Sequence, residues 1–178
     1  MNIANKLTVF RVILVPIFVL FMETDFTPYN KIIAFVVFCI ATITDKLDGT
    51  IARKYDMITD FGKFMDPIAD KLLVCSALVC LTSTGKIPAW ISIAIIAREF
   101  VVSGVRLVAA DNGVKIAATW WGKSKTISQM TMIIIMLLNI EKLAVLETVV
   151  MYVALALTMI SMIDYFIKNK AVITTGTK

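Results

Sequence analysis

Histidine does not occur among the 178 residues of the chain. Its absence excludes a histidine general base, a Ser-His-Asp triad and a metal site with imidazole ligands. Any acid-base chemistry therefore falls to carboxylates, lysine or tyrosine. Cysteine is scarce as well: Cys39, Cys75 and Cys80 lie in apolar stretches and lack the spacing of a metal site. We interpret them as buried thiols.

Charged residues are also few. They make up 17% of the chain, whereas hydrophobic residues make up 59% and the mean hydropathy is +0.86. A soluble domain usually carries about 25% charged residues. The apolar surplus exceeds what one water-facing fold can bury, so the sequence predicts an all-α integral membrane protein. Its net charge of +5 fits basic loops at an anionic lipid surface better than a nucleic-acid partner.

Long apolar runs suit helices that cross a membrane. They predict six transmembrane helices in a single domain over residues 1–178, at residues 8–22, 31–52, 65–84, 88–110, 119–139 and 143–167. With a cytoplasmic amino terminus, every lysine and arginine except Lys31, Lys86 and Lys142 falls on the cytoplasmic side. Because cytoplasmic loops carry the excess of basic residues, we expect a multi-pass cell-membrane protein with both termini in the cytoplasm. Trp120 and Tyr165, near predicted helix ends, are interpreted as anchors at the headgroup level.

Acidic residues gather at the end of the second predicted helix and the start of the third. Asp45 and Asp48 are three residues apart, and Asp66 and Asp70 are four apart. At these spacings each pair shares one helical face. Small residues lie on the same faces: Gly49 and Ala52 on the first, Gly62 and Ala69 on the second.

A short connection between these helices would bring the four carboxylates together near the membrane boundary, where an unpaired ionised acid is costly. Ligands that are all oxygens suit a hard divalent cation such as magnesium, manganese or calcium. Two such ions would cancel the four negative charges. The alternative is that the acids are solvated and pair with neighbouring lysines, namely Lys46, Lys54, Lys63 and Lys71.

One extended motif combines these residues. It reads Asp45-x-x-Asp48-Gly49-x-x-Ala52-Arg53, then eight residues, then Gly62-x-x-x-Asp66-x-x-x-Asp70. At every fixed position the motif resembles the signature of the CDP-alcohol phosphotransferases. The resemblance implies six membrane helices, a cytoplasm-facing polar cavity and a homodimer. It also implies transfer of a phosphatidyl or related group from a CDP-linked donor to an alcohol, with release of CMP.

The same resemblance assigns roles to residues of this chain. It implies that the four aspartates hold Mg²⁺ or Mn²⁺, as a two-metal site, and that Asp70 also takes the proton from the acceptor hydroxyl. Residues implied to contact the donor nucleotide or its pyrophosphate are Gly49, Ala52, Arg53 and Gly62. Asn5 and Thr8, with Arg11, either approach the nucleotide and the cavity mouth or are ordinary polar residues of a helix start.

Three segments outside the motif resemble the phosphatidylglycerophosphate synthase branch of the family. They are residues 2–11, 98–106 and 122–126. This resemblance implies CDP-diacylglycerol as donor and glycerol 3-phosphate as acceptor. Arg106, Lys123 and Lys125 are expected on the cytoplasmic side, where they would bind the acceptor phosphate. Alternatively they reflect ordinary positive-inside topology, and Arg98 pairs with Glu99.

Two other functions stay open at this point. The first is the same chemistry with another alcohol, such as inositol phosphate, serine or phosphatidylglycerol. The second is a divalent-cation transporter in which the four carboxylates form a transit site. Arg53 favours the enzyme, because a cation path has no use for an arginine that meets phosphate.

Overall fold

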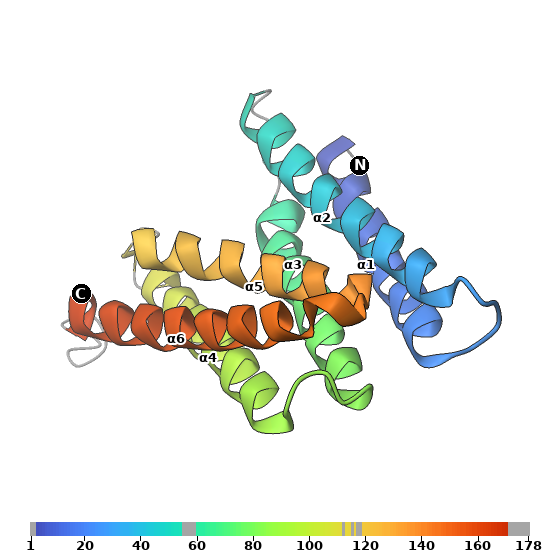
Figure 1. Cartoon of the computed structure of the whole chain (residues 1–178). Coiled ribbons are helices and arrows are strands. Elements are labelled where there is room, and N and C mark those ends of the chain that lie inside the picture. The colour runs from blue at the N-terminus through green and yellow to red at the C-terminus, as the bar shows by residue number, and fades with distance from the viewer. Residues whose placement is uncertain (1–2, 55–59, 112, 115, 117–118, 171–178) are drawn as a thin grey trace. The chain divides into compact units, whose positions relative to one another are not determined.

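The computed structural model describes the backbone of residues 3–54, 60–111, 113–114, 116 and 119–170, and their side chains except at 3–4, 45–54, 60–67, 70 and 111. Over this part of the chain it has six α-helices, one 3-10 helix and no strand (Figure 1). In chain order they are α1 (Ile3–Glu23), α2 (Asn30–Lys54), α3 (Asp60–Ser83), α4 (Ala89–Asp111), α5 (Trp120–Leu138), η1 (Glu141–Leu143) and α6 (Ala144–Lys168). The predicted all-helical class is therefore confirmed.

The helices extend beyond the apolar runs that predicted them. α1 begins at Ile3 rather than residue 8, and α3 begins at Asp60 rather than residue 65. A helix satisfies its backbone hydrogen bonds internally, so it continues through polar residues that end a hydrophobic run. The acidic motif consequently lies on helical backbone at both of its halves.

Two stretches within the described residues are long and apolar enough to cross a membrane: Asn5–Glu23 and Glu141–Lys168. Asn30–Thr44 and Lys71–Ser83 are shorter apolar helical stretches. Large apolar side chains are also exposed along both long stretches, for example Ile13 and Val145. Together with the composition, these features indicate a membrane protein, because a water-facing surface seldom carries so much apolar area.

The chain divides into two compact units. Unit 1 comprises residues 1–86 and 134–140, and unit 2 comprises residues 87–133 and 141–178. In unit 1, α1 packs against both α2 and α3, whereas α2 and α3 make few direct contacts. α1 and α2 run antiparallel (Figure 1), and the rings of Phe18 and Phe38 join them with centroids 5.7 Å apart. α1 is therefore the central helix of unit 1.

The connection between α1 and α2 is fixed by Asn30, which is buried. Its side-chain oxygen accepts hydrogen bonds from the Thr27 backbone N–H at 2.9 Å and from the Thr27 hydroxyl at 2.7 Å. Its side-chain amide donates to the carbonyl of Thr24. This arrangement closes the start of α2 in the manner of a capping box and sets how α2 returns alongside α1.

The end of α3 is fixed by Gly85, whose φ is +75°. The Gly85 N–H donates to the Thr82 carbonyl at 3.0 Å, and the Lys86 N–H donates to the Leu81 carbonyl at 2.9 Å. These two bonds form a Schellman motif, in which the left-handed residue is usually glycine. They place Lys86 directly beyond the last turn of α3.

Replacing Gly85 with alanine should lower the free energy of unfolding by about 1–2 kcal/mol, because a Cβ is disfavoured at positive φ. Gly104 offers a matched control, since it lies inside α4 and an added Cβ there meets nothing within 4 Å. Gly104→Ala should be neutral or stabilising, because alanine favours helices. Thermal unfolding of the detergent-solubilised variants measures both effects. Equal melting temperatures for Gly85→Ala and wild type would contradict the expected strain.

In unit 2, α4 packs against α6. Side chains from the first part of α5 complete the packing through hydrogen bonds to both helices. α4 ends as α3 does, with a Schellman motif at Gly113: its N–H donates to the Ala110 carbonyl at 3.0 Å, and the Val114 N–H donates to the Ala109 carbonyl at 2.8 Å. Unit 2 is thus a three-helix arrangement with a defined end at α4.

Candidate functional site

The buried face of α1 is polar at its amino-terminal end. Arg11 and Thr8 are 0% and 1% exposed, and Asn5 is also buried. Each of the three interacts with another group. Burying a guanidinium is costly unless its charge and hydrogen bonds are compensated. Such a polar stretch inside a packed helical unit indicates a functional region rather than an ordinary core.

The four aspartates of the motif lie on two helices of the same unit. Asp45 and Asp48 belong to α2, and Asp66 and Asp70 belong to α3. Their side chains lie outside the described residues, and so do those of the predicted donor-binding residues Gly49, Ala52, Arg53 and Gly62. The convergence of the carboxylates therefore stays a prediction. Among the described side chains, no group of three or more His, Cys, Asp or Glu residues is placed to hold a metal.

The polar end of α1 lies near the acidic stretch of α2 along the helix pair. The two helices run antiparallel (Figure 1), and Thr8 precedes the end of α1 by as many residues as Asp45 follows the start of α2. Because all helices rise by the same distance per residue, these two backbone positions are level with each other.

A second polar cluster lies in unit 2 and centres on Glu99. One Glu99 carboxylate oxygen lies 3.3 Å from Nη1 of Arg98 and also accepts a hydrogen bond from Nζ of Lys125. Nη2 of Arg98 donates to the Ser161 hydroxyl at 2.7 Å. The side chains of Arg98, Glu99 and Lys125 are only 8%, 13% and 4% exposed. Two buried cations therefore share one largely buried carboxylate.

Further polar contacts extend this cluster along α6. Gln129 donates to the Thr158 hydroxyl at 3.0 Å, and both side chains are buried. Nearer the end of α6, the guanidinium carbon of Arg106 lies 5.7 Å from the centroid of the Tyr165 ring. Nε of Arg98 is buried and has no hydrogen-bond partner among the described residues. A buried donor of this kind is unusual, and it is available to a ligand.

The three residues predicted to bind the acceptor phosphate differ in their surroundings. Lys125 is buried against Glu99, Arg106 is exposed beside Tyr165, and Lys123 is exposed on α5. The expected pairing of Arg98 with Glu99 is present. The interpretation of Tyr165 as a surface anchor was wrong: it is 1% exposed, because it packs inside unit 2. Trp120, by contrast, is exposed.

Sequence reasoning did not identify Glu99 as the centre of the unit 2 cluster. The sequence signal was the adjacent Arg98-Glu99 pair inside an apolar helix, where charged residues are expensive. The partner of Glu99, Lys125, and the partner of Arg98, Ser161, lie on other helices, far away in the chain. No local spacing links them.

Replacing Glu99 with glutamine should destabilise unit 2 by about 3 kcal/mol, because two buried cations lose their shared counter-charge. Lys168→Gln is the control: it removes a more exposed ion pair, with Asp164 at 2.7 Å. Lys168→Gln should lower the free energy of unfolding by about 0.5 kcal/mol or less. Unfolding of both variants in detergent gives the comparison. Equal losses of stability would show that the Glu99 cluster is not energetically special.

Comparisons with known proteins add an independent line of evidence. The family model for CDP-alcohol phosphatidyltransferase matches residues 1–160. A Bacillus subtilis protein named CDP-diacylglycerol–glycerol-3-phosphate 3-phosphatidyltransferase is 38% identical, over 98% of both chains. A probable phosphatidylglycerophosphate synthase of Mycobacterium tuberculosis is 42% identical, over 92% of this chain and 79% of the relative. A Haemophilus influenzae protein with the same name as the Bacillus relative is 40% identical, over 92% of this chain and 91% of its own.

Proposed function

Because the chain belongs to the CDP-alcohol phosphatidyltransferase family, we propose that it transfers the phosphatidyl group of CDP-diacylglycerol to glycerol 3-phosphate. The products are phosphatidylglycerol phosphate and CMP. One observation carries this choice of substrates: similarity over nearly the whole of both chains to a relative whose name specifies glycerol 3-phosphate. The complete aspartate motif between residues 45 and 70 supports the chemistry.

In the proposed reaction, the acceptor hydroxyl attacks the phosphatidyl phosphorus in line. The bond from that phosphorus to the CMP oxygen breaks, and CMP leaves. Asp70 takes the hydroxyl proton, since a positioned carboxylate can act as a general base without histidine. Arg53 pairs with the donor pyrophosphate. Holding the acceptor hydroxyl in line with the phosphatidyl phosphorus accounts for much of the rate enhancement, as is usual in phosphoryl transfer.

The nucleotide would lie along the acidic stretches, where small residues leave room for it. Gly49, Ala52 and Gly62 provide that room because they carry little or no side chain. Asn5 and Thr8 contribute polar groups from α1. Their burial on the face of α1 that is level with the acidic stretch of α2 supports this assignment.

The donor set fits a divalent cation. Asp45, Asp48, Asp66 and Asp70 offer only carboxylate oxygens, which suit Mg²⁺ or Mn²⁺, and four carboxylates match two ions in charge. When bound, such ions neutralise charge on the phosphate oxygens. The aspartates themselves would be held in place by their fixed spacing on α2 and α3.

The basic residues of unit 2 are proposed to bind the phosphate of the acceptor. Lys123 and Arg106 are exposed, and Lys125 belongs to the Glu99 cluster. The free Nε donor of Arg98 lies in the same cluster. A phosphate oxygen would satisfy that donor, which supports an acceptor that carries a phosphate.

The proposed setting is a single domain of six membrane helices with both termini in the cytoplasm, a cytoplasm-facing cavity and a homodimeric assembly. The distribution of lysine and arginine supports this orientation. The lipid tails of the donor would stay in the bilayer while the pyrophosphate lies at the aspartates.

A CMP-release assay tests the proposed function. Purified protein is incubated with CDP-diacylglycerol, a divalent cation and one alcohol at a time: glycerol 3-phosphate, serine, inositol phosphate or phosphatidylglycerol. We expect CMP release with glycerol 3-phosphate well above that with the other alcohols. Release with serine but not with glycerol 3-phosphate would overturn the acceptor. Divalent-cation flux in proteoliposomes without any CMP release would instead favour the transporter.

A further inference from the structure

Tyr165 is a buried tyrosine to which the proposed reaction assigns no role. It lies on α6 and is 1% exposed. Its hydroxyl oxygen is buried and has no hydrogen-bond partner among the described residues. A buried phenol usually finds a partner, because an unpaired polar group in a protein interior is costly. A ligand that accepts the hydroxyl hydrogen would remove that cost.

The charged neighbours of this hydroxyl are arginines of α4. The guanidinium carbon of Arg106 lies 5.7 Å from the centroid of the Tyr165 ring, and both Arg106 and Arg98 act electrostatically on the hydroxyl. A guanidinium group carries N–H donors and no acceptor. Neither arginine can therefore take the hydroxyl hydrogen.

A second unpaired donor lies along the same interface between α4 and α6. Ser161 precedes Tyr165 by four residues, so the two buried side chains are neighbours on one face of α6. The Ser161 hydroxyl accepts from Nη2 of Arg98 at 2.7 Å. Nε of the same guanidinium is buried and, within the described part of the chain, donates to no acceptor. The interface thus carries two buried donors, an N–H and an O–H, that lack an acceptor.

The carboxylates of this region do not supply that acceptor. Glu99 pairs with Nη1 of Arg98 at 3.3 Å. Oδ1 of Asp164 lies 2.7 Å from Nζ of Lys168. Oδ2 of Asp164 is buried and has no partner among the residues that the structure describes, but adjacent residues of a helix do not face each other, and Asp164 directly precedes Tyr165. An acceptor from outside the chain is therefore needed.

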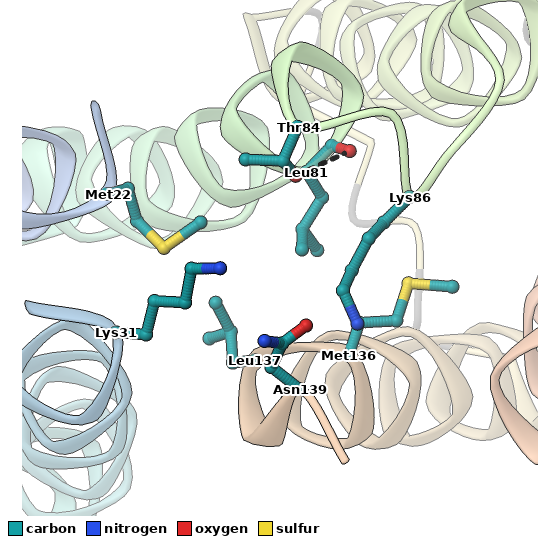
Figure 2. Close-up of a pocket in the computed structure, with 8 residues that line it drawn as sticks. All are labelled: Met22, Lys31, Leu81, Thr84, Lys86, Met136, Leu137 and Asn139. Atoms are coloured by element: carbon teal, nitrogen blue, oxygen red, sulfur yellow. Dashed lines mark hydrogen bonds between the residues drawn. The ribbon is translucent and has the colours of Figure 1, made fainter. Parts of the chain in front are cut away.

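The pocket in unit 1 is not an alternative place for a phosphate (Figure 2). Its cavity of about 30 Å³ has room for a few water molecules rather than a phosphate group. Figure 2 shows Thr84 at its wall, where the hydroxyl donates to the Leu81 carbonyl at 3.2 Å. The acidic side chain of Glu23 accepts from the Ser83 hydroxyl at 3.1 Å at the same helix ends. These features favour unit 2 for an anionic ligand.

We propose that the Tyr165 hydroxyl binds the phosphate of the acceptor alcohol, together with Nε of Arg98. Phosphate oxygens accept hydrogen bonds from both donors, and Arg106 adds a positive charge at the exposed edge of the group. This role rests on the proposed function, because it adds a residue to the site for glycerol 3-phosphate. An alcohol without a phosphate would leave both buried donors unpaired, and a site of this kind rejects such a substrate strongly. Tyr165 is thus a specificity-determining residue.

Tyr165→Phe tests this role, because it removes the hydroxyl and keeps the ring that packs inside unit 2. Tyr152→Phe is the matched control, since it makes the same change on α6 at an exposed residue. CMP release by the purified full-length protein in detergent gives kcat and the KM for each substrate. The melting temperature of each protein is followed without ligand, with glycerol 3-phosphate and with glycerol.

Tyr165→Phe should raise the KM for glycerol 3-phosphate about tenfold and leave kcat and the KM for CDP-diacylglycerol close to the wild-type values. A tenfold change corresponds to about 1.4 kcal/mol, roughly the contribution of one hydrogen bond to a charged group. The melting temperature without ligand should not fall, because the hydroxyl has no partner to lose among the described residues. Glycerol 3-phosphate should stabilise the wild type and Tyr152→Phe more than Tyr165→Phe, and glycerol should stabilise none of them.

Four outcomes would overturn this role. A wild-type KM in Tyr165→Phe, with the wild type active on glycerol 3-phosphate, would remove the hydroxyl from the acceptor site and leave the proposed function intact. A lower melting temperature with an unchanged KM would make the hydroxyl purely structural. A fall in kcat at an unchanged KM would place it at the reacting centre rather than at the phosphate. A wild type that releases no CMP with glycerol 3-phosphate would contradict the proposed function, and the role of Tyr165 with it.

Discussion

Replacing Asp70 with asparagine should lower the rate of CMP release with glycerol 3-phosphate by about 100-fold to 10,000-fold, the usual contribution of a general base. Asparagine has nearly the shape of aspartate but cannot take the acceptor proton. It also removes one negative charge from the proposed metal ligands. The measurement is the initial rate of CMP release at saturating donor and acceptor, with circular dichroism to confirm unchanged helix content.

Asp25→Asn is the matched control for this variant. Asp25 is exposed in the connection between α1 and α2, far from the motif. It undergoes the same chemical change and should keep the wild-type rate. An Asp70→Asn protein that retains a third or more of the wild-type rate would remove Asp70 from the role of base. The reaction would then require another proton acceptor.

Removing divalent cations should abolish CMP release, and adding back Mg²⁺ or Mn²⁺ should restore it. The four motif carboxylates would repel one another and the donor pyrophosphate without a counter-charge. Asp66→Asn should lower bound metal and activity together, since it removes one ligand from the set. Metal content by mass spectrometry and CMP release are measured on the same chelated and reloaded samples.

Glu141→Gln controls for the loss of an acidic charge in general, because Glu141 is exposed in η1. It should retain both metal and activity. A full rate after exhaustive chelation would refute metal dependence. Loss of activity in Asp66→Asn with wild-type metal content would keep Asp66 in the site but remove it from the metal ligands.

Much of the fold could be predicted from sequence, because apolar runs and helical periodicity are local properties. The predicted helix at 88–110 corresponds to α4 (Ala89–Asp111), and that at 143–167 corresponds to α6 (Ala144–Lys168). The errors lie where helices carry polar residues, as at the starts of α1 and α3. Hydropathy measures where a helix meets lipid, whereas the helix itself continues as long as its backbone bonds are satisfied.

The candidate site, like the fold, could be predicted from the sequence only in part. The aspartate motif was visible in sequence because its residues are close together and their spacing fits helical faces. The unit 2 cluster was visible only as isolated charges. That Lys125 lies against Glu99 rather than being exposed like Lys123 depends on which face of α5 meets α4. The spacing of residues along the chain does not show which face of α5 meets α4.

The sequence by itself determined an all-helical chain, its membrane character, and an acidic motif split between the end of one helix and the start of the next. These features follow from composition and from spacings of a few residues, which every conformation of the chain retains. Only the tertiary structure decided that Arg11 is fully buried, that Tyr165 packs inside unit 2 and that Glu99 forms ion pairs with two cations. Such facts depend on contacts between residues far apart in the chain, and packing alone creates those contacts.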